Sequence, residues 1–233
     1  MPETDQSAEA HRAVKDRLLD AALMHVAFDG WTDATFTAAI NDADVEPALA
    51  RALCPRGALD LALAYHARGD ALMLERLASA DLSAMRFRDR IAAAVRYRLE
   101  ASTDKEAVRR GTTLFALPQN APDGARAIWG TCDAIWTALG DTSDDFNWYS
   151  KRATLSGVYS STVLYWLGDD SEDHAATWEF LDRRIDNVMQ IEKLKATVRD
   201  NPLLSKLMAG PMALASHIKP PQGGAHMPGR WTR

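Results

Sequence analysis

Residues 18–53, LLDAALMHVAFDGWTDATFTAAINDADVEPALARAL, decide the fold class of this chain. They begin with an apolar stripe at helical spacing, made of Leu18, Leu19, Ala22, Leu23 and Val26. Gly30 follows at a position where a glycine commonly ends a helix. Two short helices are predicted after it, over 35–41 and 46–53. A helix, a glycine stop and two short helices joined by a turn form the layout of a helix-turn-helix unit.

The rest of the chain continues the helical pattern. Longer helices are predicted over 59–77, around Ile91 and from Pro122 onward, and no run of alternating β-branched residues is long enough to predict a strand. Five of the seven tryptophans lie between Trp129 and Trp178, so the apolar stripes of the later helices are rich in aromatic residues. The sequence therefore predicts an all-α fold.

A further helix is predicted to begin after Ser171. Ser171 is expected to be its N-cap, with Glu172 and Asp173 in the first turn, where carboxylates complement the helix dipole.

The composition indicates a globular protein with an ordinary core. Of the 233 residues, 47% are hydrophobic and 25% are charged, which is typical of soluble domains. The two cysteines, Cys54 and Cys132, predict neither a disulfide framework nor a thiolate metal site. The acidic N-terminus does not resemble a secretory signal, and no apolar run approaches the roughly 20 residues of a membrane span. Any contact with a membrane is therefore expected to be peripheral.

Three short segments resemble one protein family. They are Asp-Phe-Asn-Trp-Tyr at 145–149, Leu-Pro-Gln-Asn-Ala-Pro at 117–122 and Thr-Trp-Glu-Phe-Leu-Asp-Arg-Arg-Ile at 177–185. In this order they resemble the Coq nine family of ubiquinone-biosynthesis accessory proteins, which are lipid-binding relatives of the TetR regulators. The resemblance runs from about 14 to 189. It implies a TetR-like helical bundle with an N-terminal helix-turn-helix-like unit and a C-terminal amphipathic helix.

The domain organisation follows from these patterns. The final segment, rich in proline and glycine, is expected to be disordered because it cannot bury enough apolar surface to offset its ordering entropy. The predicted parts are a flexible N-terminus over 1–13, a helix-turn-helix-like unit over 14–68, a lipid-binding bundle over 69–200, an amphipathic helix over 201–219 and a disordered tail over 220–233.

The charge of the helix-turn-helix-like unit argues against DNA binding. From 12 to 66 there are five cations and eight acidic residues, whereas neutralised phosphates supply most of the non-specific affinity for DNA. The segment Asp-Val-Glu-Pro at 44–47 also places carboxylates at the start of the would-be recognition helix. A purely structural role for this three-helix unit is therefore favoured over DNA binding, and a role as an interaction surface for a protein partner remains open. The alternative function is a ligand-responsive TetR-type regulator that binds DNA as a dimer.

The apolar stripes over 128–189 have two interpretations. From the residues alone, such stripes are more often plain core than ligand lining. The family resemblance implies instead a hydrophobic cavity that accepts an isoprenoid or a phospholipid tail. The residues expected to line it are Leu114, Phe115, Ile128, Trp136, Leu155, Val158, Tyr159, Thr162, Leu181 and Met189.

Trp148 and Tyr149 predict a surface feature. Adjacent helix positions are about 100 degrees apart, so both rings cannot face the same core. Exposed aromatics beside Asp145 and Arg152 have the composition of an interface hot spot, although a half-buried Tyr149 with a bonded hydroxyl fits equally well. The resemblance implies that this patch docks the di-iron demethoxyubiquinone hydroxylase. The partner-binding residues expected on that basis are Asp133, Ile135, Asp145, Trp148 and Tyr149.

The C-terminal segment has the pattern of an interfacial helix. From 193 to 219 it carries five cations against one acidic residue, which favours attraction to anionic headgroups. Gly210-Pro211 interrupts the helical pattern, and packing onto the protein's own core or onto a dimer partner is a close alternative. The resemblance implies membrane binding, on the cytoplasmic or mitochondrial-matrix face. The expected membrane-binding residues are Leu203, Leu204, Lys206, Leu207, Met208, Leu214 and Ile218.

No motif for catalysis is found. A di-iron bundle requires Glu-x-x-His pairs, and no glutamate in this chain has a histidine three residues later. The sequence also has no Walker loop, no glycine-rich dinucleotide fingerprint and no His-Glu-x-x-His pattern. We therefore expect a protein that is not an enzyme and that has no metal ion or cofactor. We also expect it to form a homodimer.

Overall fold

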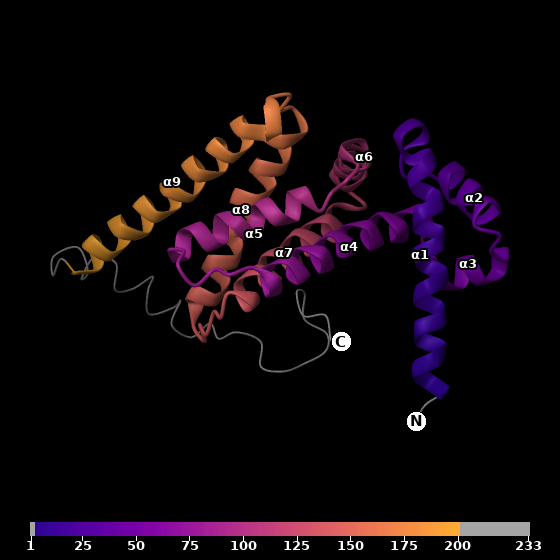
Figure 1. Ribbon diagram of the computed structural model, residues 1–233, viewed down its shortest axis with the longest axis horizontal. Coiled ribbons are helices and arrows are strands. Elements are labelled where there is room, and N and C mark those ends of the chain that lie inside the picture. Colours follow the sequence, from indigo (N-terminus) through magenta and orange to yellow (C-terminus); the bar gives the residue numbers. More distant parts are fainter. Residues whose placement is uncertain (1–2, 201–233) are drawn as a thin grey trace. The chain divides into compact units, whose positions relative to one another are not determined.

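The computed structural model describes residues 3–200 of the chain (Figure 1), and the all-α prediction is confirmed there, since no strand occurs within this range. The predicted segments 201–219 and 220–233, with their membrane-binding residues, lie outside the described residues. The helices are α1 (Glu3–Asp29), α2 (Asp33–Asp42), α3 (Pro47–Leu53), α4 (Ala58–Ser79), α5 (Phe87–Glu100), α6 (Lys105–Ala116), α7 (Ala121–Ala138), α8 (Phe146–Leu167), the 3-10 turn η1 (Glu172–His174) and α9 (Ala175–Asp200).

The described chain divides into two compact units. The first comprises 3–71 and 101–127, and the second comprises 72–100 and 128–200. This division differs from the sequence prediction because α6 and the start of α7 belong with the helix-turn-helix-like unit. Residues 3–13, which were expected to be flexible, form the first turns of α1.

The first unit is built on α1, and α2 and α3 both pack against it (Figure 1). The predicted stop at Gly30 is confirmed: its φ is +68°, a left-handed conformation that favours glycine, and its N–H donates to the Val26 carbonyl at 2.9 Å. Trp31 then donates from its indole nitrogen to the Ala107 carbonyl at 3.1 Å, which ties α6 to this unit. The core contains Leu18, Leu19, Ala22, Val26, Trp31, Phe36, Ile40, Val45 and Leu61.

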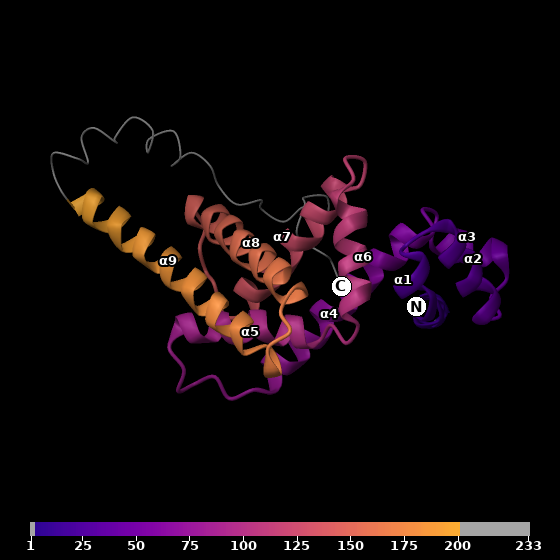
Figure 2. The same cartoon turned by 90° about the horizontal axis from the view of Figure 1, so that it is seen from above.

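The second unit contains α5, α8 and α9, in which α8 and α9 lie side by side and α5 contacts α9 (Figure 2). Arg88 on α5 forms an ion pair with Asp186 on α9, which joins these two helices outside the apolar contact. The buried apolar side chains of this unit include Ile91, Val95, Leu99, Ile135, Leu155, Val158, Tyr159, Leu181 and Ile185.

The start of α9 differs from the sequence prediction. Glu172 and Asp173 lie in η1 rather than in the first turn of α9, because Asp173 has a positive φ of 50° that breaks the helix. Ser171 still helps to cap α9, since its hydroxyl accepts from the Ala176 N–H at 3.1 Å. The stronger cap is Asp169, whose carboxylate accepts from the Thr177 N–H at 2.9 Å. Hydrogen bonds from Ser171 and Thr177 hold the Asp169 pKa well below its usual range.

No helix within 3–200 is both long enough and apolar enough to cross a membrane.

Candidate functional site

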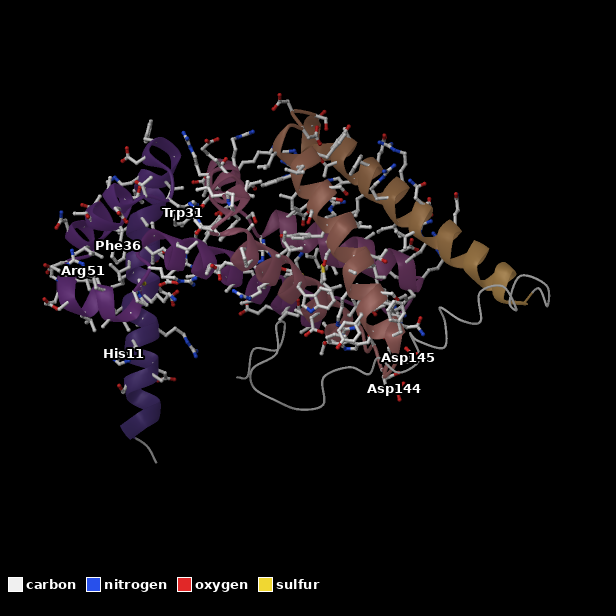
Figure 3. The ribbon with its side chains drawn as sticks, turned by 180° about the vertical axis from the view of Figure 1, so that it is seen from behind. His11, Trp31, Phe36, Arg51, Asp144 and Asp145 are labelled. Carbon is white, nitrogen blue, oxygen red and sulfur yellow. The ribbon has the colours of Figure 1, made fainter. Side chains whose placement is uncertain are left out.

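The start of α8 is fixed by Asp145. One carboxylate oxygen of Asp145 accepts from the backbone N–H of Asn147 at 2.8 Å, and the other accepts from the Asn147 side-chain amide at 2.8 Å. A carboxylate at this position satisfies a free helix N–H group and complements the helix dipole. Asp144 and Asp145 are both exposed and project from the end of the unit (Figure 3). The acidic turn therefore sets the direction of α8 and remains accessible.

Arg152 is the centre of a buried polar cluster beneath this turn. Only 2% of its side chain is exposed. Its Nε donates to Asp133 on α7 at 2.5 Å, and one terminal nitrogen donates to Asp141 at 3.0 Å and to the Trp148 carbonyl at 3.1 Å. The guanidinium also lies 4.0 Å from the centre of the Trp148 ring. One side chain thus joins α7, the α7–α8 loop and the first turn of α8.

Lys151 completes the charge balance of the cluster. Its ammonium donates to Asp141 at 2.8 Å and to the Ser143 hydroxyl at 2.6 Å. Two cations therefore face two carboxylates, so no charge in the cluster is left uncompensated, as burial requires. Burial raises the Asp141 pKa, but hydrogen bonds from Lys151, Ser143 and Arg152 outweigh it and lower that pKa to about 2.

An aromatic group covers the cluster. The ring of Trp148 meets Tyr149 edge to face at 4.8 Å, and Trp129 on α7 lies 6.0 Å from Trp148 and 6.4 Å from Tyr149. Trp148 is buried, whereas Trp129 and Tyr149 are half-buried. Phe146 is 44% exposed and lies one helical turn before Tyr149.

These side chains form one surface, which we call the aromatic-acidic patch and define as Trp129, Asp144, Asp145, Phe146 and Tyr149. It combines rings with carboxylates, and the rings contact residues that the Arg152 cluster holds in place. Its composition suits recognition of a protein partner more than chemistry on a small molecule. No group of three or more His, Cys, Asp or Glu side chains that could hold a metal ion occurs in the described part of the chain.

The COQ9 family model matches residues 121–192, which include α7, α8 and this patch. The chain is 32% identical over 198 residues to "Ubiquinone biosynthesis protein COQ9, mitochondrial" of Drosophila melanogaster, covering 83% of this chain and 60% of that protein. It is 29% identical over 196 residues to "Probable ubiquinone biosynthesis protein coq9, mitochondrial" of Dictyostelium discoideum, covering 80% and 63%. The chain belongs to the COQ9 family. It spans about three fifths of the length of these curated relatives.

The fold of this COQ9-family chain is also that of TetR regulators. The crystal structure of a TetR transcriptional regulator from Nitrosomonas europaea matches it with a TM-score of 0.62 and 20% sequence identity, covering 74% of this chain and 95% of that one. The TetR-like prediction is therefore confirmed at the level of the fold.

The structure places the five predicted partner-binding residues at different depths. Asp145 is exposed and Tyr149 is half-buried, whereas Trp148 is 7% exposed, so the two adjacent rings differ in burial, as helix geometry predicts, although they remain in contact. Asp133 is 9% exposed and bound to Arg152. Ile135 is fully buried, so in this COQ9-family chain it has no surface with which to touch a partner. Asp133, through Arg152, and Trp148, through its contact with Tyr149, support the patch from below.

Arg152 is the residue whose place the sequence interpretation missed, because it was expected beside the exposed aromatics. Its spacing contained the signal, since it lies four residues after Trp148 and three before Leu155, on the buried stripe of α8. A charged residue on that stripe must find buried partners. Asp133 and Asp141 fill that role.

The residues predicted to line a lipid cavity are not brought together at one described cavity. Leu155, Val158, Tyr159, Thr162, Trp136 and Leu181 are buried in the second unit, and Ile128 is half-buried there. Leu114 and Phe115 are half-buried in the first unit, where Phe115 packs so closely on Gly124 that an added Cβ would lie 2.7 Å away. The side chain of Met189 lies outside the described residues. Leu181 alone of the set lines a pocket of the second unit that is described below.

We expect the stability of the chain to fall in acid partly through Asp141. The pKa of Asp141 is lower in the folded state than in the unfolded chain, so its ionised form stabilises the fold above the unfolded pKa of about 4. This contribution, about 2 kcal/mol, is lost as the pH falls from about 4 through the folded pKa. Asp141→Asn should remove this contribution at neutral pH. The free energy of unfolding of the variant should then fall less steeply with decreasing pH than that of the wild-type chain. Urea unfolding at a series of pH values, followed by tryptophan fluorescence, measures both curves.

Asp144→Asn is the matched control, because Asp144 is exposed on the same loop. The lowered pKa of Asp169 is common to all three proteins, so it cancels in the differences. Equal acid dependence in Asp141→Asn and the wild-type chain would contradict this role for Asp141.

Proposed function

We propose that this chain is a non-catalytic accessory protein of ubiquinone biosynthesis, which binds isoprenoid quinone intermediates and presents them to the di-iron demethoxyubiquinone hydroxylase. Membership of the COQ9 family supports the pathway, since the curated relatives are titled ubiquinone biosynthesis proteins. The observation that carries the presentation step is the aromatic-acidic patch, held above the buried Arg152 cluster.

The patch supports docking because its rings are ordered before a partner arrives. Tyr149 packs edge to face on Trp148, and Trp148 is covered on another side by the Arg152 guanidinium. A preorganised aromatic surface loses less conformational entropy on binding than a flexible loop does. The carboxylates of Asp144 and Asp145 beside it favour a partner surface that carries Arg or Lys.

The proposed lipid is an isoprenoid quinone intermediate or a phospholipid. The apolar helices of the second unit support it, because each buried methylene contributes about 0.8 kcal/mol without a directional partner. The structure has these side chains packed together, so a tail would enter by displacing side chains of α8 and its neighbours. Peripheral attachment through 201–219, on the cytoplasmic or mitochondrial-matrix face of a membrane, is part of the same proposal.

The charge at α3 supports an accessory role over DNA binding. Glu46 caps α3 by accepting from the Leu49 N–H at 2.8 Å, and backbone hydrogen bonds from Ala48 and Leu49 lower its pKa. The start of the would-be recognition helix therefore keeps an ionised, exposed carboxylate where a phosphate would approach.

One change at the half-buried Tyr149 and one at the exposed Asp144 should weaken docking without unfolding the chain. Tyr149→Ala removes a ring from the centre of the patch, and Asp144→Arg reverses a charge at its edge. We expect the double variant to bind the hydroxylase at least ~30-fold more weakly, which corresponds to about 2 kcal/mol and is typical of a hot-spot loss. Surface plasmon resonance with the purified hydroxylase measures this change.

The control is the double variant Tyr165→Ala and Asp170→Arg, which makes the same substitutions at exposed positions away from the patch. Normal binding by a folded Tyr149→Ala and Asp144→Arg variant would show that the hydroxylase docks elsewhere. Trp148 is left intact because truncating a buried ring costs about 3–5 kcal/mol of stability.

The lipid proposal is tested separately. Protein purified without detergent should carry isoprenoid quinone precursors or phospholipid above a mock purification when organic extracts are analysed by mass spectrometry. Leu155→Arg, which places a charge on the buried face of α8, should empty the protein of lipid if it remains folded. Wild-type extracts that match the mock purification would count against a lipid carrier.

A further inference from the structure

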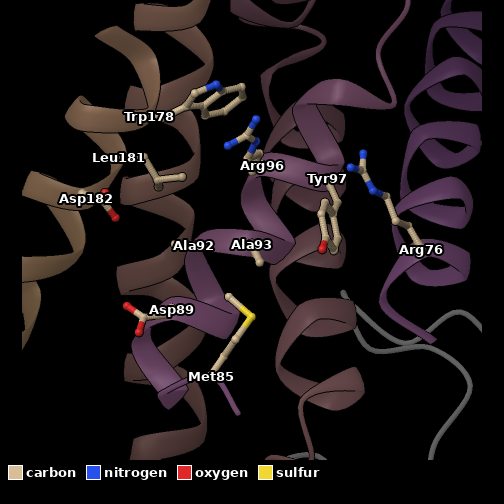
Figure 4. Close-up of a pocket in the computed structure, with 10 residues that line it drawn as sticks. All are labelled: Arg76, Met85, Asp89, Ala92, Ala93, Arg96, Tyr97, Trp178, Leu181 and Asp182. Atoms are coloured by element: carbon tan, nitrogen blue, oxygen red, sulfur yellow. The ribbon is translucent and has the colours of Figure 1, made fainter. Parts of the chain in front are cut away.

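A pocket of about 410 Å³ lies in the second unit, apart from the aromatic-acidic patch (Figure 4). It is formed by side chains from the end of α4, from α5 and the segment before it, and from the start of α9. Its volume lies within the range of small-molecule sites. None of the residues assigned to docking takes part in it.

The floor of the pocket is apolar. Ala92 and Ala93 on α5 are small, so they leave space, and Leu181 on α9 is 2% exposed and closes the opposite side. Met85 adds a flexible apolar side chain at one end (Figure 4). A ring or a short hydrocarbon chain would lose its water contacts here without leaving a polar group unpaired.

Two arginines stand at the other end of the pocket. Arg96 donates from Nε to Glu100 at 2.6 Å, and Arg76 donates to the other oxygen of the same carboxylate. One carboxylate thus serves two guanidiniums, so one positive charge is not compensated there. In the described part of the chain, the terminal amino groups of Arg96 have no acceptor.

Aromatic rings fix these arginines in position. The Arg76 guanidinium lies 4.1 Å from the centre of the Tyr97 ring, and that of Arg96 lies 4.8 Å from the centre of the Trp178 ring. Both arginines are about half exposed, so a ligand can reach their edges. An arginine held flat in this way presents paired N–H groups that match the two oxygens of a carboxylate.

The acids that line the pocket lie at its other end, where they pair with Arg86 and Arg88. Asp89 is bound by Arg86 at 2.7 Å and lies 3.3 Å from Arg88. Asp182 lies 3.7 Å from Arg88 and is 60% exposed. Arg88 also pairs with Asp186, so three carboxylates share two guanidiniums at this end. The positive excess is confined to the other end, where Arg76 and Arg96 share Glu100.

We propose that this pocket binds a free, small amphipathic anion: an apolar ring or short chain that carries one carboxylate. The carboxylate binds Arg96 and Arg76, and the apolar body lies over Ala92, Ala93 and Leu181. This site is independent of hydroxylase docking, and it shares only Leu181 with the residues predicted to line a lipid cavity.

Isothermal titration calorimetry of the full-length chain with matched probes tests this assignment. We expect 2-naphthoate to bind saturably, and 2-naphthol, which lacks the carboxylate, to bind at least ~10-fold more weakly. Arg96→Gln should weaken 2-naphthoate by about tenfold, the effect of losing one charge-assisted hydrogen bond, and should leave 2-naphthol unchanged. Arg183→Gln is the control, because Arg183 is an exposed arginine on α9 that does not line the pocket.

Ala93→Leu provides a second variant that leaves the charges intact and fills the floor, so it should abolish binding of both probes. Binding of 2-naphthoate that is unaffected by both Arg96→Gln and Ala93→Leu, or no saturable binding at all, would overturn the proposal.

Vesicles of phosphatidylglycerol distinguish a lipid headgroup from a free anion. If the vesicles bind in an Arg96-dependent manner while 2-naphthoate does not bind, the site belongs to the membrane surface and the proposal is wrong.

Discussion

The structure of the second unit depends on the burial of one guanidinium. Arg152 lies inside the fold, where an isolated charge costs several kcal/mol, and it is tolerated because Asp133, Asp141 and the Trp148 carbonyl surround it. These partners come from α7, from the α7–α8 loop and from α8, so the same contacts that neutralise the charge also fix three segments. Breaking such a group by removing one member costs about 3–5 kcal/mol, because the others stay buried and unpaired.

The exposed features of this region follow from that cluster. Trp148 is held between Arg152 and Tyr149, and Trp129 packs against both rings, so the aromatic-acidic patch rests on a rigid base. Asp145 caps α8 and fixes its first turn. A COQ9-family chain with this arrangement presents aromatic anchors without first ordering a loop, which supports the proposed docking of a protein partner.

Much of the fold was predictable from local patterns, because helical stripes and the stop at Gly30 are properties of neighbouring residues. The different burial of Trp148 and Tyr149 followed from helix geometry alone. The burial of Arg152 was missed because charged residues are usually exposed, although its place on the buried stripe of α8 was a usable signal. The pocket could not be predicted, since its walls come from α5 and α9, which are about 80 residues apart in sequence and meet only in the folded chain.

Hydrogen–deuterium exchange of Arg152→Met is the most direct measurement of whether this cluster holds the region together. The account predicts that amides over 141–151 lose protection, while amides over 18–26 in the first unit keep theirs. Lys151→Met, which removes a half-exposed cation from the same cluster, should cause a clearly smaller loss. Unchanged protection over 141–151 in a folded Arg152→Met chain would contradict the claim that the buried guanidinium organises the start of α8.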